Sequence, residues 1–231
     1  MLKAAIIGYG KMGKEVEKVL LETGMTVSVI INDENEWEDA FPAFLESDIA
    51  IEFTSPENTL KNFERCFKHR IPLISGTTGW NAKENEVINR CRQENLSFIY
   101  SSNFSIGANL FFKINEQFAK LINHHPQYAV SIEETHHINK KDAPSGTAIT
   151  TEQSILKELK NARSIPVVSH RVGDITGEHT VFYTSPDDTI AITHTAKNRS
   201  IFAQGAVKAA AWLVENPGVY HFSDIVIHLK N

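Results

Sequence analysis

The chain has 231 residues and a net charge of −5, from 23 Lys and Arg residues against 28 Asp and Glu residues. This mildly acidic balance gives no reason to expect a nucleic acid or an anionic membrane surface as a partner. No apolar run approaches the roughly 20 residues that cross a bilayer, and the N-terminus has no signal-peptide pattern, so we expect a soluble, cytoplasmic protein. In that compartment Cys66 and Cys91 are expected to be reduced thiols.

The first hundred residues alternate short apolar runs with longer amphipathic ones. The short runs predict strands, and the amphipathic runs, with their charged outer faces, predict helices. This alternation favours a parallel sheet covered on both faces. Residues 34–44 are ambiguous, and Pro42 is expected to limit any helix there. The predicted strands are 4–7, 27–31, 49–53, 72–74 and 97–100, and the predicted helices are 14–22, 57–68 and 82–94.

The pattern changes after about residue 107, where β-type runs become more frequent. Pro186, Asp187 and Asp188 supply a turn between two of these runs. The change predicts a second domain of the α+β class with a mainly antiparallel sheet. The predicted helices are 109–121, 148–160 and 202–215, and the predicted strands are 128–133, 165–170, 179–184, 189–195 and 225–227.

A Gly-x-Gly-x-x-Gly pattern follows the first predicted strand directly and opens the first predicted helix, the context in which this short motif indicates a dinucleotide site. Gly8 permits the tight turn, Gly10 lets the backbone approach a pyrophosphate, and Gly13 allows helix and strand to pack closely. A glycine-rich turn without a ligand is the alternative for these residues alone. The loop as a whole comprises Gly8, Tyr9, Gly10, Lys11, Met12 and Gly13.

Three further loops follow predicted strands, at the edge where the carboxyl ends of parallel strands meet a cofactor crevice. The small polar side chains of the two later loops can hydrogen-bond a nicotinamide carboxamide, and the aromatic ring of Phe104 can pack against the nicotinamide. Each loop alone could be no more than a turn, and only their common position favours binding. The residues are Thr54; Gly76, Thr77 and Thr78; and Ser101, Ser102, Asn103 and Phe104.

The second predicted strand is followed by Asn32 and Asp33. A carboxylate here would accept hydrogen bonds from the adenosine ribose and repel a 2′-phosphate. We therefore favour NADH over NADPH as the donor. Use of both stays open, because Lys11 in the glycine loop could reach a phosphate.

Residues 133–147 carry two imidazoles, two ammonium groups, three carboxylates and a Ser-Gly-Thr helix start. Lys140 lies four residues beyond His136, close enough for both to meet one small molecule if the segment turns. The Pro-containing stretch that follows predicts such a turn. Ser145 or Thr147 can cap the next helix, whose free N–H groups would hold a carboxylate or phosphate. A polar surface loop is the alternative for any one residue, but the cluster favours an anionic substrate beside an ionisable centre.

The run from His136 to Ala148, HHxxKxDAPSGTA, closely resembles the signature of the 4-hydroxy-tetrahydrodipicolinate reductase (dihydrodipicolinate reductase) family of bacterial lysine biosynthesis. This motif is long and specific, unlike a three-glycine pattern. Further matches occur in the family's order and extend the resemblance over nearly the entire chain. They are GYGKMG at 8–13, EFTSPE at 52–57, GTTG at 76–79, NFSIG at 103–107, GEH at 177–179 and ITH at 192–194.

The resemblance implies NAD(P)H-dependent reduction of (2S,4S)-4-hydroxy-2,3,4,5-tetrahydrodipicolinate to tetrahydrodipicolinate, with loss of water. A hydride delivered to an imine-conjugated ring leaves electron density that must be protonated, and His is the usual donor near neutral pH. We assign His136 as this acid/base and Lys140 as a second proton donor. The residues assigned to the dicarboxylate substrate are His137, Ser145, Gly146 and Thr147.

The resemblance also implies the domain organisation and the assembly. It places a Rossmann-type dinucleotide-binding domain at 1–107, completed by 200–231, and a substrate-binding and oligomerisation domain at 108–199, in a homotetramer. Where the family has an acidic residue followed by a basic one, this chain has Asn32 and Asp33, and the missing basic residue weakens the case for NADPH. In similar proteins the two later loops of the first domain contact the nicotinamide.

Three alternatives to this assignment fit the sequence less well. Ten histidines raise the question of a metal site, but adjacent imidazoles such as 124–125 and 136–137 lack ligand spacing, and no Cys or clustered carboxylate completes a set, so we predict no metal. His179 and His194 are interpreted as structural. Another two-domain dehydrogenase would not explain HHxxKxDAPSGTA. A non-catalytic dinucleotide sensor would have no need of His136 and Lys140.

Overall fold

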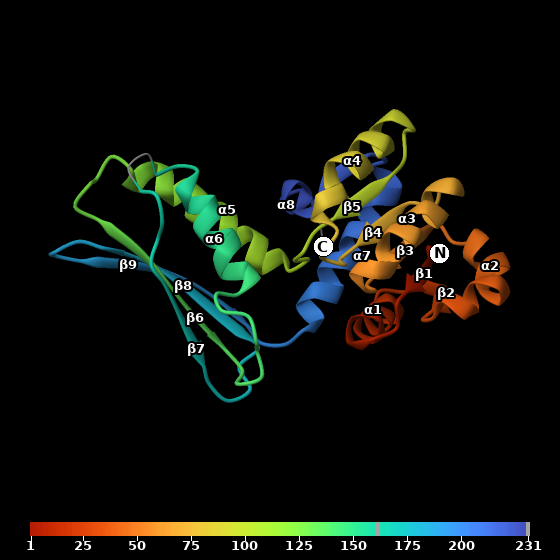
Figure 1. The fold of residues 1–231 in the computed structure, drawn as a ribbon, viewed down its shortest axis with the longest axis horizontal. Coiled ribbons are helices and arrows are strands. Elements are labelled where there is room, and N and C mark those ends of the chain that lie inside the picture. Colours follow the sequence, from red (N-terminus) through yellow and green to blue (C-terminus); the bar gives the residue numbers. More distant parts are fainter. Residues whose placement is uncertain (160–161, 230–231) are drawn as a thin grey trace. The chain divides into compact units, whose positions relative to one another are not determined.

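The computed structural model describes residues 1–159 and 162–229. Figure 1 traces the chain through two compact units, one formed by Met1–Ser105 with the segment from Ser200 onward, the other by Ile106–Arg199. Within the part of the chain that the structure describes, no helix has both the length and the apolar character needed to cross a membrane.

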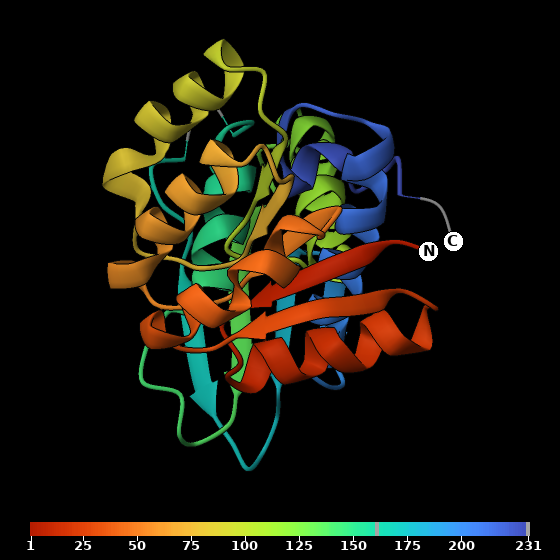
Figure 2. The same ribbon diagram turned by 90° about the vertical axis from the view of Figure 1, so that its right-hand side faces the viewer.

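Six parallel strands form the sheet of the first unit, in the order β10-β5-β4-β3-β1-β2, so the predicted Rossmann-type sheet is confirmed. Figure 2 shows β1 and β2 side by side and pointing the same way. Successive residues of β1 alternate between two buried faces. Ala5 and Ile7 pack with Phe63, whereas Ile6 faces Gly13 of α1. The strands are β1 (Lys3–Ile7), β2 (Thr26–Ile31), β3 (Ile49–Glu52), β4 (Leu73–Ser75), β5 (Phe98–Tyr100) and β10 (Val219–His221).

Helices connect these strands, and α1 and α7 pack against each other. The chain passes from β1 to β2 on one side and then crosses to β3 on the other side of β1. This reversal opens a crevice at the carboxyl ends of β1 and β3, where such sheets bind ligands. The helices are α1 (Lys11–Glu22), α2 (Trp37–Leu45), α3 (Pro56–Lys68), α4 (Glu84–Gln93), α7 (Ser200–Glu215) and α8 (Phe222–Ile225), with 3-10 helices at Glu34–Glu36 and Asn81–Lys83.

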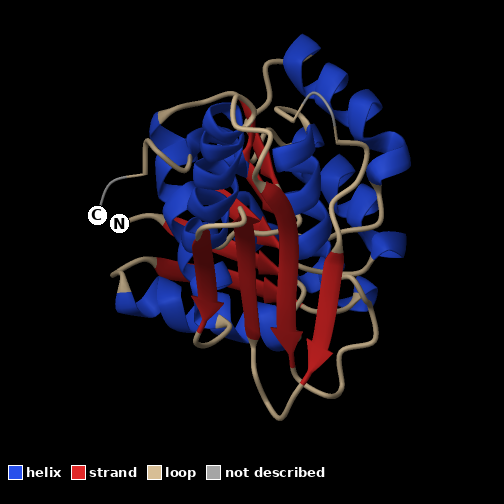
Figure 3. Ribbon diagram, turned by 90° about the vertical axis from the view of Figure 1, so that its left-hand side faces the viewer, coloured by secondary structure: helices blue, strands red, loops and turns tan. Residues whose placement is uncertain are grey.

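A four-stranded sheet in the order β7-β6-β8-β9 forms the second unit. β6 and β7 are parallel and the other two pairs antiparallel, which confirms the predicted mainly antiparallel sheet. Two packed helices cover one face, over a core that includes Phe111, Ile155 and Tyr183. Figure 3 looks onto the other face of this sheet. The elements are α5 (Ile106–Ile122), β6 (Ala129–His136), α6 (Gly146–Leu156), β7 (Val167–Arg171), β8 (Gly177–Thr184) and β9 (Thr189–Ala196).

The predicted last strand at 225–227 is wrong. The short helix α8 ends at Ile225 and residues 226–228 form a turn, and the last strand, β10, comes earlier. Phe222, Ile225 and Val226 are buried while Ile227 is 63% exposed. Burial at positions i, i+3 and i+4 is the spacing of a helix, which three consecutive apolar residues conceal.

Two helix predictions also need correction. Pro42 lies inside α2 and does not prevent the helix, because Ala40 and Phe44 bury one helical face against the sheet. That packing outweighs the hydrogen bond that a proline cannot donate. The helix predicted at 148–160 begins at Gly146 and ends at Leu156, and residue 160 lies outside the described residues.

Candidate active site

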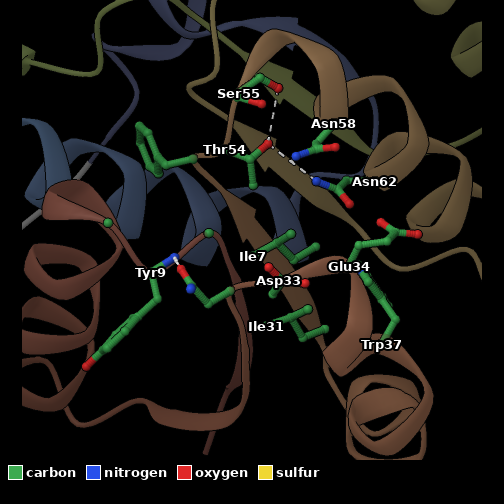
Figure 4. A pocket seen from close by; sticks show the side chains of 14 residues that line it. Ile7, Tyr9, Ile31, Asp33, Glu34, Trp37, Thr54, Ser55, Asn58 and Asn62 are labelled. Atoms are coloured by element: carbon green, nitrogen blue, oxygen red, sulfur yellow. Dashed lines mark hydrogen bonds between the residues drawn. The ribbon is translucent and has the colours of Figure 1, made fainter.

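The first unit has a pocket at the carboxyl ends of β1, β2 and β3, at the crevice described above (Figure 4). Its volume of about 290 Å³ is near the lower end for small-molecule sites, which is enough for one part of a dinucleotide. The predicted residues that line it are Gly8, Tyr9, Gly10, Asn32, Asp33 and Thr54. The other lining residues are Ile7, Ile31, Glu34, Trp37, Phe53, Ser55, Asn58 and Asn62.

The glycine loop has a shape that larger residues could not adopt. Gly8 has a φ of 91°, and a Cβ there would lie 2.2 Å from the carbonyl oxygen of Phe53. A Cβ at Gly13 would lie 2.1 Å from the carbonyl oxygen of Gly8, so a larger residue would push α1 away from β1. At Gly10, a Cβ would meet no atom within 4 Å, and no described side chain caps the helix that starts there. Open space beside free helix N–H groups fits a pyrophosphate.

The remaining loop residues link β1 to β2. The N–H of Tyr9 donates to the Asn32 side-chain oxygen at 3.0 Å, and the Tyr9 hydroxyl donates to Glu17. Lys11 is exposed and Met12 is half-buried on the first turn of α1. The Tyr9 N–H is therefore used within the protein, whereas the N–H groups of the first turn of α1 have no acceptor four residues earlier in the helix and could meet a ligand.

The edge of the pocket after β2 carries carboxylates. Asp33 caps the following 3-10 turn by accepting hydrogen bonds from the backbone and side-chain N–H groups of Asn35, at 3.0 and 2.8 Å. Glu34 pairs with the Arg65 guanidinium, which lies 4.3 Å from the ring centroid of Trp37. The hydrogen bond from Arg65 holds the pKa of Glu34 below its usual range. Sequence reasoning singled out Asp33 but missed the Glu34–Arg65 pair, whose members lie 31 positions apart.

A buried carboxylate organises the loops after β3 and β4. Glu52 has no exposed surface and accepts hydrogen bonds from the Ser75 and Thr77 hydroxyls at 2.6 and 2.9 Å. It also accepts the Thr59 hydroxyl at 3.2 Å and both the N–H and the hydroxyl of Thr54. The Thr54 N–H donates to the Thr77 hydroxyl as well, at 2.8 Å. The predicted residues Thr54 and Thr77 therefore meet at Glu52, to which the sequence analysis assigned no role.

The remaining predicted cofactor residues lie in tight turns. A Cβ at Gly76 would lie 1.9 Å from the ring of Phe53. The Ser101 hydroxyl accepts the Asn103 N–H at 3.0 Å and so closes a turn. Phe104 is 1% exposed over the whole residue and its ring packs edge-on against Phe53, so its contact with the nicotinamide stays a prediction. Thr78 and Ser102 are exposed.

In the second unit, the predicted motif joins the end of β6 to the start of α6. His136 is buried, and His137 is half-buried just beyond the strand. Ser145 caps α6 by accepting a backbone N–H of the first helical turn at 3.2 Å. Gly146 is exposed, with no atom within 4 Å of where a Cβ would be, and Thr147 is half-buried. The start of α6 is thus open enough for an anion to approach its N–H groups.

Lys140 is held within this loop by two interactions. Its ammonium group lies 2.8 and 2.9 Å from the two carboxylate oxygens of Asp142, and this hydrogen bonding lowers the pKa of Asp142. Arg171 of β7 donates to the carbonyl oxygens of Lys140 and Asp142, at 3.3 and 2.5 Å. The loop therefore presents the Lys140 ammonium from a fixed backbone.

Glu134 lies two residues before His136, so both side chains project from the same face of β6. It has no exposed surface. Its oxygens accept the Ser145 N–H at 3.0 and 3.1 Å, the Ser169 hydroxyl at 2.7 Å and the Arg171 guanidinium at 3.3 Å. Burial alone would raise the pKa of Glu134, but the hydrogen bonds from Ser145 and Ser169 outweigh it and lower the pKa.

Two histidines share this carboxylate. His136 Nδ1 lies 3.5 Å from Glu134 Oε2, and His179 Nε2 of β8 lies 3.6 Å from the same atom. Burial lowers the pKa of His136, and the Glu134 carboxylate partly offsets this. Burial and the neighbouring His136 lower the pKa of His179 to about 4, so His179 is neutral near pH 7. His136 is therefore the better proton donor of the two.

Sequence reasoning missed part of this cluster. His179, interpreted as structural, lies in it, and it also binds the Ser145 hydroxyl at 3.0 Å. Ser169, Arg171 and His179 reach Glu134 through strand register, which no local pattern signals.

The same cluster brings together a carboxylate and two imidazoles, which the sequence analysis did not expect. Ligand atoms of Glu134, His136 and His179 lie within 4.8 Å of one another, a spacing that a metal ion could use. The Glu134 oxygens are already engaged by neutral donors and by Arg171, whose positive charge would oppose a cation. We therefore interpret the set as a hydrogen-bonded cluster around an acid.

Comparisons with known proteins agree over both units. The family models described as dihydrodipicolinate reductase, N-terminus, and dihydrodipicolinate reductase, C-terminus, match residues 2–104 and 107–226. A 4-hydroxy-tetrahydrodipicolinate reductase of Christiangramia forsetii is 40% identical, with 99% of each chain covered. One of Wigglesworthia glossinidia brevipalpis is 38% identical over 78% of this chain and 67% of its own. A solved dipicolinate-bound dihydrodipicolinate reductase of a Paenisporosarcina species has a TM-score of 0.77 at 22% identity, covering 97% of this chain and 99% of its own.

Proposed function

Because the chain belongs to the dihydrodipicolinate reductase family, we propose that it reduces (2S,4S)-4-hydroxy-2,3,4,5-tetrahydrodipicolinate to (S)-2,3,4,5-tetrahydrodipicolinate in diaminopimelate and lysine biosynthesis. The donor is a nicotinamide dinucleotide. The observation that carries the proposal is the motif loop of the second unit. It sets a buried imidazole and a fixed ammonium group beside a helix start that is open to a carboxylate.

The chemistry divides between the cofactor and the protein. The substrate hydroxyl leaves as water together with a hydrogen from the neighbouring ring carbon, and this elimination produces a conjugated ring. The dinucleotide, when bound, supplies a hydride to that ring. The electron density left on the ring takes up a proton, which His136 delivers from its imidazolium form. Lys140 neutralises the dicarboxylate and acts as a second proton donor. The net change consumes one reduced donor and one proton for each product and water formed.

Substrate binding rests on the groups around the start of α6. One ring carboxylate meets the N–H of Gly146 and the N–H and hydroxyl of Thr147, and His137 contacts the substrate from the loop. Ser145 has a different part, since its N–H is bonded to Glu134 and its hydroxyl to the helix and to His179. We therefore assign Ser145 to holding the binding loop in place.

NADH is the favoured donor over NADPH, as carboxylates dominate the pocket edge after β2. Asp33 and Glu34 both line the pocket, and the nearby cation, Arg65, is already paired with Glu34. A 2′-phosphate would meet this negative edge, whereas a ribose hydroxyl could donate to it. Lys11 is exposed at the glycine loop and keeps some use of NADPH open.

Assembly and compartment follow the same family assignment. We propose a homotetramer that uses the face of the β7-β6-β8-β9 sheet opposite α5 and α6, where Val168, Glu133 and Thr180 are paired across three strands. We propose the cytoplasm as the compartment, since Cys66 and Cys91 are both free thiols. The two parts of the dinucleotide-binding domain are residues 1–107 and 200–231, with 108–199 as the substrate domain.

The decisive experiment is a steady-state assay of NADH and NADPH oxidation with freshly generated hydroxy-tetrahydrodipicolinate. We expect turnover with both and a higher kcat/KM for NADH. His136→Gln should lower kcat by roughly 10²-fold with NADH affinity unchanged, since general acid catalysis typically contributes 10²–10⁴-fold. His124→Gln, an exposed histidine of the same unit, is the matched control and should retain full activity. Absence of oxidation with either donor would reject the function.

A further inference from the structure

Glu134 is the feature of the second unit that the proposed chemistry does not yet use. Its carboxylate is fully buried and joins three separate segments of the chain. It accepts the Ser145 N–H at the start of α6, and the Ser169 hydroxyl and the Arg171 guanidinium from β7. Arg171 in turn holds the carbonyl groups of the Lys140 loop. One carboxylate therefore contacts both the segment that carries the proton donors and the segment that binds an anion.

Contacts at both ring nitrogens, Nδ1 and Nε2, set the orientation of the His136 ring. Nδ1 is fully buried and has no hydrogen-bond partner among the described residues, but it lies 3.5 Å from Glu134 Oε2, so the two groups interact through charge. The opposite nitrogen, Nε2, lies beside Gly177 of β8, where a Cβ would come within 3.0 Å of it. The negative charge of Glu134 beside Nδ1 favours a proton on that nitrogen and leaves Nε2 as the nitrogen that can face a ligand. The missing side chain at Gly177 leaves room for the ring to hold this position.

We propose that Glu134 is a positioning residue for the reduction: it orients His136 with Nδ1 toward the buried carboxylate and Nε2 toward the substrate, and it fixes the start of α6 relative to that imidazole. This inference rests on the proposed function for its kinetic consequence. Its structural part, the state of the His136 ring, can be measured without turnover.

Charged and titratable groups from every neighbouring segment act on His136. Glu134 of the same strand and Asp142 of the loop favour the imidazolium, whereas Lys140 and Arg171 oppose it. His179 of β8 adjoins the ring at a centroid distance of 5.0 Å, with His194 of β9 paired behind it. Burial is the largest influence and lowers the pKa of His136, and Glu134 is the leading influence in the other direction. Removing the Glu134 charge must therefore lower the pKa of His136 further.

The test compares Glu134→Gln with Asp187→Asn, which alters an exposed carboxylate in the turn between β8 and β9 of the same unit. The His136 ring is titrated by NMR with isotope-labelled histidine, and its signal is assigned by its loss in His136→Gln. We expect a lower His136 pKa in Glu134→Gln and no change in Asp187→Asn. In the assay, an acid with a lower pKa loses its proton at lower pH. The fall in kcat with rising pH should therefore begin at lower pH, and kcat at neutral pH should drop about tenfold.

Each outcome is decisive. A folded Glu134→Gln protein with the wild-type His136 titration and the wild-type pH profile would overturn the proposal, even if its KM rose, because Glu134 would then only anchor the loop. If Glu134→Gln does not fold, Glu134→Asp takes its place. It keeps the charge but withdraws it from His136 Nδ1, so the His136 pKa should fall below its wild-type value, and an unchanged titration would overturn the proposal. A wild type without reductase activity would reject the function, while the NMR comparison would still decide the role of Glu134.

Discussion

Two glutamates with no exposed surface, one in each unit, show how surroundings decide what a buried carboxylate does. Glu52 is surrounded by hydroxyl and N–H donors from threonine and serine residues, with no cation among its hydrogen-bond partners in the described residues. Glu134 also accepts a backbone N–H and a serine hydroxyl, but it faces a guanidinium and two imidazoles as well.

The difference separates two tasks. Neutral donors around Glu52 can only hold geometry, and the residues they belong to are those of the loops predicted to meet the nicotinamide. Glu134 has titratable partners, and its charge changes the pKa of the imidazoles beside it. Its position therefore influences proton transfer as well as geometry. Glu52 of the first unit therefore holds the loops around the pocket in place, and Glu134 of the second unit influences the pKa of the acid His136.

The largest expected effect is on the stability of the first unit. Glu52→Ala leaves the donors of Thr54, Thr59, Ser75 and Thr77 without their acceptor, and we expect the free energy of unfolding to fall by about 3 kcal/mol, since a buried unsatisfied group costs about 1–3 kcal/mol. Glu215→Ala, which alters an exposed carboxylate at the end of α7, should change it by less than about 0.5 kcal/mol. Urea unfolding measures both.

The pH dependence of kcat in a folded Glu52 variant tests this difference between the two carboxylates. The less disruptive Glu52→Gln should weaken NADH binding and leave the pH profile of kcat in place. A shift of that profile comparable to the shift expected for Glu134→Gln would mean that the two carboxylates do not differ in the way described.

The next largest effect concerns capture of the anionic substrate in the second unit. Pyridine-2,6-dicarboxylate should compete with substrate, and pyridine-2-carboxylate should bind at least about tenfold more weakly, because a charge-assisted hydrogen-bonded group contributes about 1.5–3 kcal/mol. Thr147→Val should reduce this discrimination. Inhibition constants for both compounds provide the check, and equal values would show that the start of α6 is only a cap and turn.

A third effect separates the position of His136 from its charge. In Gly177→Ala, the new methyl group would lie 3.0 Å from His136 Nε2, so the ring has to move by a few tenths of an ångström. We expect kcat to fall about tenfold, since misplacement of about 1 Å can cost 10²-fold. The melting temperature and NADH affinity should stay near wild type. Unchanged kcat would show that Nε2 does not need its present position.

How much the sequence predicted depends on how far each interaction reaches along the chain. The glycine loop and the segment from His136 to Thr147 are contiguous, so their residue types and spacing define them without knowledge of the fold. Glu134 meets Ser169 and Arg171 because β6 pairs with β7, and it meets His179 because β6 pairs with β8. Strand register is a property of the whole sheet, so the acid could be predicted but its surroundings could not.

The failures in secondary structure have the same origin. Residues 225–227 are apolar, and periodicity alone cannot assign so short a run to a strand or a helix. Pro42 is unfavourable within a helix, and only the burial of neighbours such as Phe44 explains why α2 continues through it. In both places tertiary packing outweighs the local preference.

The smallest expected effect concerns the donor and tests the other carboxylates of the cofactor pocket. Glu34 currently engages the Arg65 guanidinium, which stacks on Trp37 at the pocket edge. Glu34→Gln removes one negative charge and releases part of the hydrogen-bonding capacity of Arg65, which could then pair with a 2′-phosphate. We expect NADPH affinity to rise about fivefold, a modest gain because the pair is partly exposed and screened by solvent.

NADH affinity should be unchanged, and Glu38→Gln on the exposed side of α2 serves as the control. Dissociation constants for both donors, from nicotinamide fluorescence, give the ratio. If that ratio stays at its wild-type value, Arg65 does not reach the 2′ position, and the preference for NADH must rest on Asp33 alone.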